Sequence, residues 1–212
     1  MKNIIKNVSQ SDDFDYGYYG SNAFFLKRWL WWSRLTLAQK VYLNHESQID
    51  KNNVLDFGSA FGFFPAYLSK IFKRVYLVEI NDHFLDQGVA IHKKFGNNNF
   101  VPVVNRVDDP LSFVDKIPDK IDLFLFFDVL EHVRNIDRFL LMIKNIASDN
   151  SYILISLPTE NFLYMFLTKF KKEEDHCNRY FEVTKILEKN NYKLIEKRSL
   201  LYLFNIYLYK VK

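Results

Sequence analysis

The chain has 212 residues, 49% of them hydrophobic and 25% charged, which is typical of one globular domain with a full hydrophobic core. The formal net charge of +4 is too small for the basic stripe that marks a nucleic-acid-binding protein. The single cysteine, Cys177, excludes an internal disulfide, and no apolar run suits a signal peptide or a membrane span. We therefore expect a cytoplasmic protein with no stable membrane insertion and no nucleic-acid partner.

The first part of the chain predicts a polar arm followed by an aromatic helix. Residues 1–21 are polar, rich in tyrosine and interrupted by glycine, and they predict the arm. Residues 22–45 predict the helix, in which Phe25, Trp29 and Trp32 recur at the spacing of one helical face. This helix either packs on a sheet as ordinary core or forms a lid over a ligand. The aromatic side chains available to such a lid are Tyr16, Tyr18, Tyr19, Trp29, Trp31 and Trp32.

The rest of the chain alternates between short apolar runs, typical of buried strands, and segments with helical periodicity. Residues 49–212 are therefore expected to form one core domain, preceded by an arm and lid helix in residues 1–48. The expected strands cover residues 53–57, 74–80, 100–105, 121–127, 151–157, 192–200 and 201–211, and the expected helices cover residues 64–72, 82–95, 136–147 and 181–190. This order predicts an α/β fold: a Rossmann-like, mostly parallel sheet of seven strands, with one antiparallel strand near the C-terminus and helices on both faces.

A turn punctuated by glycines follows the first of these strands. Asp56 lies near the end of the strand, Gly58 can take a sharp turn, and Gly62 lets a ligand approach the backbone where the next helix begins. Glu79 ends the second strand 21 positions after Gly58, about the spacing at which a carboxylate reaches ribose hydroxyls. The alternative is a generic α/β turn with a surface glutamate. We favour a nucleoside-binding site because the turn, the helix and the acidic strand end occur together.

The pattern Asp56-x-Gly58-x-Ala60-x-Gly62 resembles the first motif, (D/E)-x-G-x-x-x-G, of the class I S-adenosylmethionine-dependent methyltransferases. Residues 127–133, FDVLEHV, resemble the D-x-L-E-H-V segment that follows the fourth strand in the small-molecule branch of that family. Ubiquinone-type and sugar-modifying enzymes typify this branch. The resemblance covers about residues 50–200, and it is specific for the cofactor and says little about the acceptor.

The resemblance implies that S-adenosyl-L-methionine is the cofactor, and it implies where the cofactor lies. Glu79 would accept hydrogen bonds from both ribose hydroxyls, and Asp108 or Asp109 would lie near the adenine amino group. Ala60 stands where many relatives have glycine, which narrows the loop without removing the glycines that turn it. The other residues expected at the cofactor are Asp56, Gly58, Ser59, Gly62 and Asp128.

Methyl transfer to oxygen or nitrogen, which the resemblance implies, benefits from a proton acceptor. His132 is the candidate base, since it follows the fourth strand at the edge where open α/β sheets hold ligands. His176 is the second candidate and would reach the site from the loop after the fifth strand. Either histidine could instead only pack against or cap a helix. The spacing of these histidines and Glu131 fits no compact metal-ligand motif, so no metal site is expected.

The expected partner is a small-molecule acceptor, best matched by a sugar or nucleotide-linked sugar of envelope biosynthesis. Arg34 and Arg179 would meet its anionic groups, and Tyr19 and Trp32 would line its pocket. A quinone-like or lipid intermediate is the alternative acceptor. The competing functions are a nicotinamide-dependent oxidoreductase on a similar sheet and a non-catalytic adenosyl-binding scaffold subunit. Both a monomer and a homodimer fit the sequence.

Overall fold

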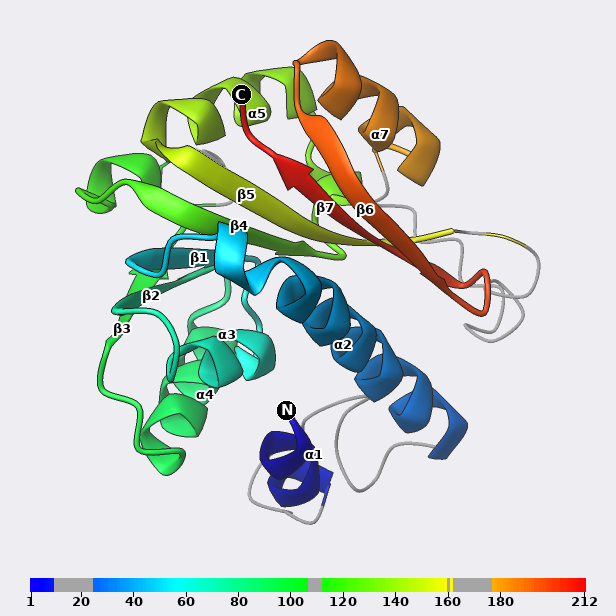
Figure 1. Cartoon of the computed structure of the whole chain (residues 1–212). Coiled ribbons are helices and arrows are strands. Elements are labelled where there is room, and N and C mark those ends of the chain that lie inside the picture. The colour runs from blue at the N-terminus through cyan, green and yellow to red at the C-terminus, as the bar shows by residue number, and fades with distance from the viewer. Residues whose placement is uncertain (10–24, 107–111, 160, 162–176) are drawn as a thin grey trace.

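The computed structural model describes residues 1–9, 25–106, 112–159, 161 and 177–212, and its centre is a single sheet (Figure 1). Within these residues, seven strands lie in the order β3-β2-β1-β4-β5-β7-β6. They are β1 (Asn53–Phe57), β2 (Arg74–Glu79), β3 (Phe100–Val104), β4 (Ile121–Phe127), β5 (Ala147–Pro158), β6 (Lys193–Leu200) and β7 (Phe204–Lys210). Strands β1 to β5 pair in parallel, whereas β7 runs antiparallel to both β5 and β6. The predicted sheet is confirmed.

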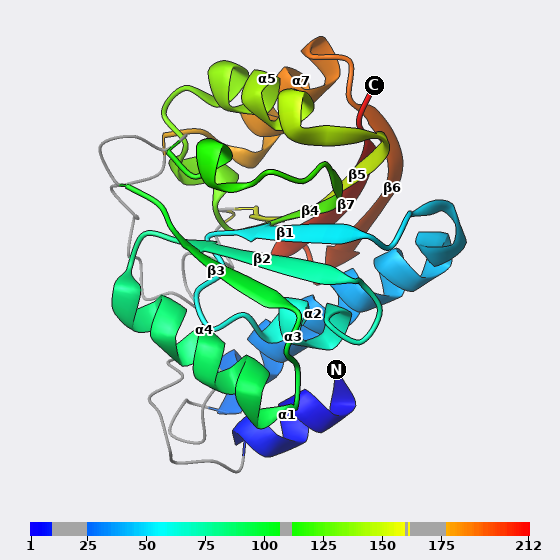
Figure 2. The same cartoon turned by 90° about the vertical axis from the view of Figure 1, so that its left-hand side faces the viewer.

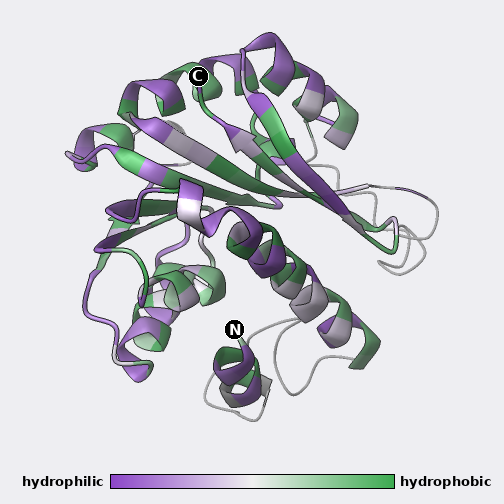
Figure 3. Cartoon of the chain, in the orientation of Figure 1, coloured by the Kyte–Doolittle hydropathy of each residue, from purple (hydrophilic) through white to green (hydrophobic). Residues whose placement is uncertain are grey.

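Helices cover both faces of the sheet, as predicted (Figures 1 and 2). One face carries α1 (Lys2–Ser9), α2 (Phe25–His45), α3 (Phe63–Leu68) and α4 (Asp82–Lys94), and the other carries α5 (Ile136–Ile146) and α7 (Tyr180–Lys189). Side chains alternate along each strand, so Val54 packs with the first helical layer and its neighbour Leu55 with the second. The central strands are apolar along much of their length because both of their faces are covered (Figure 3).

The prediction of an arm over residues 1–21 is wrong at its start, where the structure has helix α1. Met1, Ile4 and Val8 recur three and four residues apart, and all three are buried in the same cluster as the strand side chains of the first helical layer. Polar neighbours dominate the composition of this segment and conceal the helical spacing. Residues 10–21 lie outside the described residues.

The aromatic face predicted for α2 is wrong in part. Trp32 is buried, but Phe25 is 67% exposed and Trp29 is 48% exposed. The N-terminal end of α2 points away from the sheet, so its first turns have less structure to pack against (Figure 1). The face that α2 does bury consists of Leu30, Trp32, Arg34, Leu35, Ala38, Val41 and Tyr42. Arg34 thus belongs to the buried face of α2, whereas Phe25 and Trp29 do not.

Strand β5 is longer than predicted at both ends and includes Pro158, which was expected to stop it. Pairing of β5 with β4 ends at Ser156, whereas pairing with β7 continues to the pair of Pro158 and Phe204. At this point β5 has a partner on one side only. Proline is tolerated there because its missing N–H interrupts no ladder on the open side.

His92 joins α4 to the elements around it. The side chain has no exposed surface, and its Nδ1 lies 3.1 Å from Ser69 Oγ, just after α3. Its ring packs against Phe100 at the start of β3, with 5.1 Å between the ring centroids. A Cβ at Gly62 would lie only 3.3 Å from its Nε2. Burial lowers the pKa of His92 to about 4, so the fold holds this imidazole neutral.

We predict that His92 makes the fold sensitive to acid. The ordinary pKa of 6.5 falls to about 4 in the folded chain, so between these values the unfolded chain binds a proton that the folded chain excludes. The free energy of unfolding should therefore fall as the pH drops through this window, by about 3 kcal/mol in all, at roughly 1.4 kcal/mol per pKa unit. Urea titrations at a series of pH values would measure it. A His92→Gln variant should lose this part of the pH dependence, and an unchanged slope would contradict the prediction.

Candidate functional site

The loop between β1 and α3 is held in a tight turn by hydrogen bonds to β2. The backbone N–H groups of Gly58 and Ser59 both donate to the carbonyl oxygen of Val78, at 2.9 and 3.1 Å. The N–H of Gly62 donates to the carbonyl oxygen of Ser59 at 2.7 Å. Gly58, Ala60 and Gly62 have φ values of 71°, 43° and 62°. Two glycines therefore stand where a left-handed backbone is needed, while Ala60 adopts it at a steric cost.

Gly58 also touches the loop that follows β4. A Cβ at this position would overlap Cγ2 of Val129. The two loops can meet only because position 58 has no side chain. The contact brings the glycine turn against residues 127–133, so the two motifs that the sequence singles out form one site at the carboxyl edge of the sheet.

The carboxylate of Glu79 is buried behind the same turn. Its Oε2 accepts a hydrogen bond from the N–H of Ala60 at 2.8 Å. Its Oε1 accepts from the N–H groups of Ile80 and Asn81, at 2.8 and 3.1 Å. Glu79 therefore ties the end of β2 to the glycine turn, a role that its position in the sequence did not predict.

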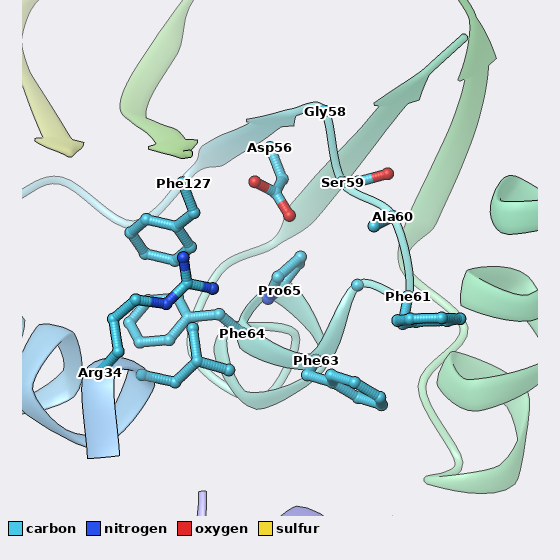
Figure 4. A pocket seen from close by; sticks show the side chains of 12 residues that line it. Arg34, Asp56, Gly58, Ser59, Ala60, Phe61, Phe63, Phe64, Pro65 and Phe127 are labelled. Atoms are coloured by element: carbon cyan, nitrogen blue, oxygen red, sulfur yellow. The ribbon is translucent and has the colours of Figure 1, made fainter. Parts of the chain in front are cut away.

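A pocket lies between the glycine turn, α3 and α2 (Figure 4). Its polar side chains are Arg34, Asp56 and Ser59. The Oγ of Ser59 is buried and makes no hydrogen bond within the described part of the chain. The apolar side chains of the wall are mostly aromatic: Leu35, Phe61, Phe63, Phe64, Pro65 and Phe127. This wall suits a ligand with both charged and apolar parts.

Acidic side chains outnumber basic ones at this edge. Asp56 is 4% exposed, and burial raises its pKa well above the usual range; Glu79 raises it further, and Arg34 opposes the shift. Asp128, just after β4, forms an ion pair with Arg34 and accepts a hydrogen bond from Ser156 Oγ at 3.0 Å. The guanidinium of Arg34 thus interacts with the carboxyl groups of Asp56 and Asp128, and because acidic groups predominate we expect the site to favour a ligand with net positive charge.

The four described residues predicted to act on the acceptor lie in four different places. His132 ends the short 3-10 helix η4 (Leu130–His132) and is exposed beside the site, outside the pocket wall. Trp32 is buried against Phe63 of the wall, with 5.1 Å between their rings. Arg179 is exposed, and its N–H donates to the carboxylate of Glu182 at the start of α7. Only Arg34 of this set lines the pocket itself.

Four predicted residues, Tyr19, Asp108, Asp109 and His176, lie outside the described residues. The chain becomes described again at Cys177, directly after His176. The N–H groups of Cys177 and Asn178 donate to the carbonyl oxygen of Glu131 in η4, at 2.7 and 3.0 Å. Cys177 and Asn178 therefore lie against the loop that follows β4.

The sequence reasoning missed a row of aromatic rings at the pocket. Trp32 contacts Phe63, Phe63 stacks with Phe61 at 5.5 Å, and Phe61 meets Phe84 of α4 at 5.4 Å. The row links α2, the glycine turn and α4. Phenylalanines at positions 61, 63 and 64 around Gly62 were a visible signal, but their number in the whole chain made them resemble ordinary core residues.

The described part of the chain contains neither a candidate metal site nor a candidate membrane-spanning helix. No group of three or more histidine, cysteine, aspartate or glutamate side chains is placed to hold a metal ion there. No described helix is long and apolar enough to cross a membrane.

Comparison with known proteins gives a family and a fold. The family model for a methyltransferase domain matches residues 32–197. No protein with a curated description matches the chain significantly. Magnesium protoporphyrin IX methyltransferase from Synechocystis PCC 6803, solved with bound SAH, is similar with a TM-score of 0.72, 15% identity and full coverage of both chains.

Two further solved structures are similar over most of their length. The N-methyltransferase NodS from Bradyrhizobium japonicum has a TM-score of 0.67 and 14% identity, with 85% of this chain and 96% of that chain covered. A SAM-dependent methyltransferase from Aquifex aeolicus has a TM-score of 0.60 and 19% identity, with 82% and 89% covered. At these identities the structures establish a shared fold.

We predict that Gly58→Ala destabilises the chain by more than about 2 kcal/mol, because the new methyl group meets Val129 and the backbone is left-handed. Gly96 is a matched control, since its φ is also 71° but nothing lies within 4 Å of a methyl group added there. Gly96→Ala should cost only about 1 kcal/mol. Chemical denaturation would compare the two variants. Equal losses would show that backbone strain alone, and not the contact between the loops, constrains position 58.

Proposed function

The chain belongs to the family of methyltransferase domains, and from this premise we propose that it moves a methyl group from S-adenosyl-L-methionine to oxygen or nitrogen of a small molecule. The observation that carries the proposal is the pocket at the carboxyl edge of β1, where Asp56, Ser59 and the glycine turn stand beside the buried carboxylate of Glu79. Ligands of open α/β sheets bind at this edge.

The residues present suit the proposed methyl donor. Gly58 and Gly62 leave the turn without side chains, which lets a ligand lie close to the backbone. The buried Ser59 Oγ offers a hydrogen bond that no described residue takes. Asp56 would attract an ammonium group. When bound, S-adenosyl-L-methionine supplies a methyl group on a positively charged sulfonium, and an edge rich in carboxyl groups favours that charge.

Glu79 would hold the ribose. Its carboxylate already accepts three backbone N–H groups, but two carboxylate oxygens offer about four acceptor positions. Glu79 can therefore fix the turn and still accept a hydroxyl. Ile80, the next residue, is 53% exposed and offers an apolar surface for a base. Asp108 and Asp109 stay predicted partners of the adenine amino group.

The acceptor would enter beside an apolar surface that we call the aromatic rim, defined as Phe25, Leu26, Trp29, Leu201 and Tyr202. All five side chains are exposed, Tyr202 by 80%. The two halves of the rim belong to α2 and to the turn between β6 and β7, which meet where Leu30 packs with Leu203 and Phe204. Trp29 lies about one helical turn from Trp32 and Arg34 at the pocket.

This rim supports an acceptor with a quinone-like or lipid-like apolar body. The sugar acceptor preferred from the sequence needs cations at the mouth, but Arg34 is buried and paired, and Arg179 does not line the pocket. We therefore propose the apolar acceptor first, and the sugar stays a prediction. Residues 1–48 would act as the lid over this entrance, although α1 and α2 also share one core cluster with the sheet.

Two competing functions make different predictions for binding and activity. A nicotinamide-dependent oxidoreductase would bind a nicotinamide dinucleotide and ignore S-adenosylhomocysteine. A non-catalytic scaffold subunit would bind the adenosyl compound without transferring a methyl group, and would need a partner for activity. Binding and turnover measurements together separate the three.

We predict that S-adenosylhomocysteine binds in titration calorimetry and that Glu79→Gln lowers its affinity by about 10–100-fold, because a buried charged acceptor is lost. Glu188→Gln, an exposed change on α7 across the sheet, is the matched control and should leave the affinity unchanged. Binding of a nicotinamide dinucleotide in place of S-adenosylhomocysteine would refute the proposed function. Unchanged affinity in Glu79→Gln would refute only the ribose assignment.

We predict that His132→Ala lowers turnover by about 10²–10⁴-fold and leaves S-adenosylhomocysteine affinity unchanged, if the exposed imidazole takes the acceptor proton. The acceptor must first be found by mass spectrometry, with a labelled methyl donor and a panel of quinone-like, lipid and sugar compounds. His45→Ala is the control, since His45 pairs with Glu196 at the far end of α2. A loss below about fivefold would exclude His132 as the base and leave His176 as the candidate.

A further inference from the structure

The aromatic rim occupies two tips of the fold, the first turns of α2 and the turn between β6 and β7. Figure 1 shows both tips projecting to the same side of the molecule, away from the centre of the sheet. We propose that the rim docks the chain on the surface of an anionic lipid bilayer. The contact is inferred from the rim itself, whereas its use, the delivery of an apolar acceptor from the bilayer to the site, rests on the proposed function.

The turn between β6 and β7 has a backbone that disfavours the side chains it carries. The N–H of Leu203 donates to the carbonyl oxygen of Leu200 at 2.8 Å, and the two residues between them, Leu201 and Tyr202, have φ values of 49° and 58°. Two consecutive positive φ values match a type I′ hairpin turn, which strongly prefers Asn-Gly. A large side chain in this left-handed conformation raises the free energy of the folded chain.

Packing within the fold does not account for these two side chains. Leu201 is 56% exposed and Tyr202 is 80% exposed, while the packing of this turn against Leu30 of α2 comes from Leu203 and Phe204. Neither the turn geometry nor the core therefore favours a leucine and a tyrosine at these positions. A strained turn that displays apolar groups to solvent indicates a contact outside the chain.

The first turns of α2 have a composition that suits a bilayer surface. Phe25, Leu26 and Trp29 are exposed, and Lys27 and Arg28 stand among them in the sequence. Tryptophan and tyrosine favour the level of the lipid headgroups, because their rings are apolar at one end and polar at the other. Lysine and arginine extend apolar stems along such a surface and keep their charges in water. Both tips of the rim thus combine an interfacial aromatic ring with aliphatic groups.

Charge indicates which partner the rim fits. Neither residues 25–30 nor residues 197–202 contain an aspartate or a glutamate, and each segment contains a lysine followed by an arginine. These four cations are Lys27, Arg28, Lys197 and Arg198. Glu196 offsets the last of them through an ion pair, and the segments keep an excess of positive charge. Two copies of the chain meeting through the rim would place cations against cations, whereas anionic headgroups attract them.

Vesicle binding by the unaltered chain tests the inference without a methyl donor and without a variant. The probes are vesicles of phosphatidylcholine alone and vesicles of phosphatidylcholine and phosphatidylglycerol in equal parts, compared by co-sedimentation over a series of lipid concentrations. We expect the anionic vesicles to be bound at least about tenfold more tightly, and added salt to reduce the difference. Equal binding to both kinds of vesicle, or binding to neither, would overturn the inference.

A variant of the turn separates binding from folding. Leu201→Asn combined with Tyr202→Gly introduces the pair that a type I′ turn prefers, so chemical denaturation should show a chain at least as stable as the unaltered one. The same variant should bind anionic vesicles at least about tenfold more weakly, because two apolar groups are lost. Lys27→Gln should weaken this binding about fivefold.

Leu141→Asn is the matched control for the turn variant. Leu141 is 55% exposed, close to the value for Leu201, and lies on α5 at the opposite face of the sheet from α2. The control should leave vesicle binding unchanged. Unchanged binding by the turn variant, or equal losses in the turn variant and the control, would contradict docking through the rim.

The remaining outcomes distinguish this inference from the proposed function. A chain that binds S-adenosylhomocysteine but no vesicles would overturn the inference and leave the proposed function standing. A chain that binds anionic vesicles but no S-adenosylhomocysteine would overturn the proposed function and leave the docking surface standing. A concentration-dependent dimer that ignores vesicles, and that the turn variant converts to a monomer, would overturn the inference and assign the rim to a second copy of the chain.

Discussion

The site depends on a close contact between two loops at the carboxyl edge of the sheet. The turn after β1 and the loop after β4 can touch because Gly58 has no side chain where Val129 approaches. The same turn is hydrogen-bonded to Val78 and to the carboxylate of Glu79 at the end of β2. Three neighbouring strand ends are thus locked together, and the pocket is the space that they leave against α2 and α3.

This arrangement concentrates charge where burial makes charge costly. Asp56 and Glu79 are both buried at the edge, and the pKa of Asp56 is raised chiefly because its carboxyl group has lost water. Such groups add little to stability unless they are paired. A cationic ligand would offset the free-energy cost of burying these two carboxyl groups. A methyl donor with a sulfonium and an ammonium group would be such a ligand.

The N-terminal helices give the site its remaining wall. Helix α2 contributes Arg34 and Leu35 to the pocket, and its Trp32 begins the row of rings that crosses the glycine turn to α4. The first turns of the same helix expose Phe25 and Trp29, which belong to the proposed acceptor entrance. One helix therefore serves the proposed donor through its buried face and the proposed acceptor through its exposed end.

The sequence by itself determined the order of strands and helices along the chain, the mixed sheet and the glycine turn, because these depend on local patterns: apolar runs, helical spacing and glycines that accept a left-handed backbone. It also determined that Asp56 and Glu79 come to one edge, since parallel strands carry their carboxyl ends to the same side. Tertiary structure decided which face of α2 is buried, that Arg34 belongs to the pocket, and that Glu79 braces the turn. The first two depend on how α2 lies against strands far along the chain, and helical spacing does not specify which element a helix packs against. The role of Glu79 depends on the path of the turn after β1, which brings the N–H of Ala60 to its carboxylate. For the same reason the short helix α1, whose three apolar residues are buried by distant elements, could not be recognised from its polar composition.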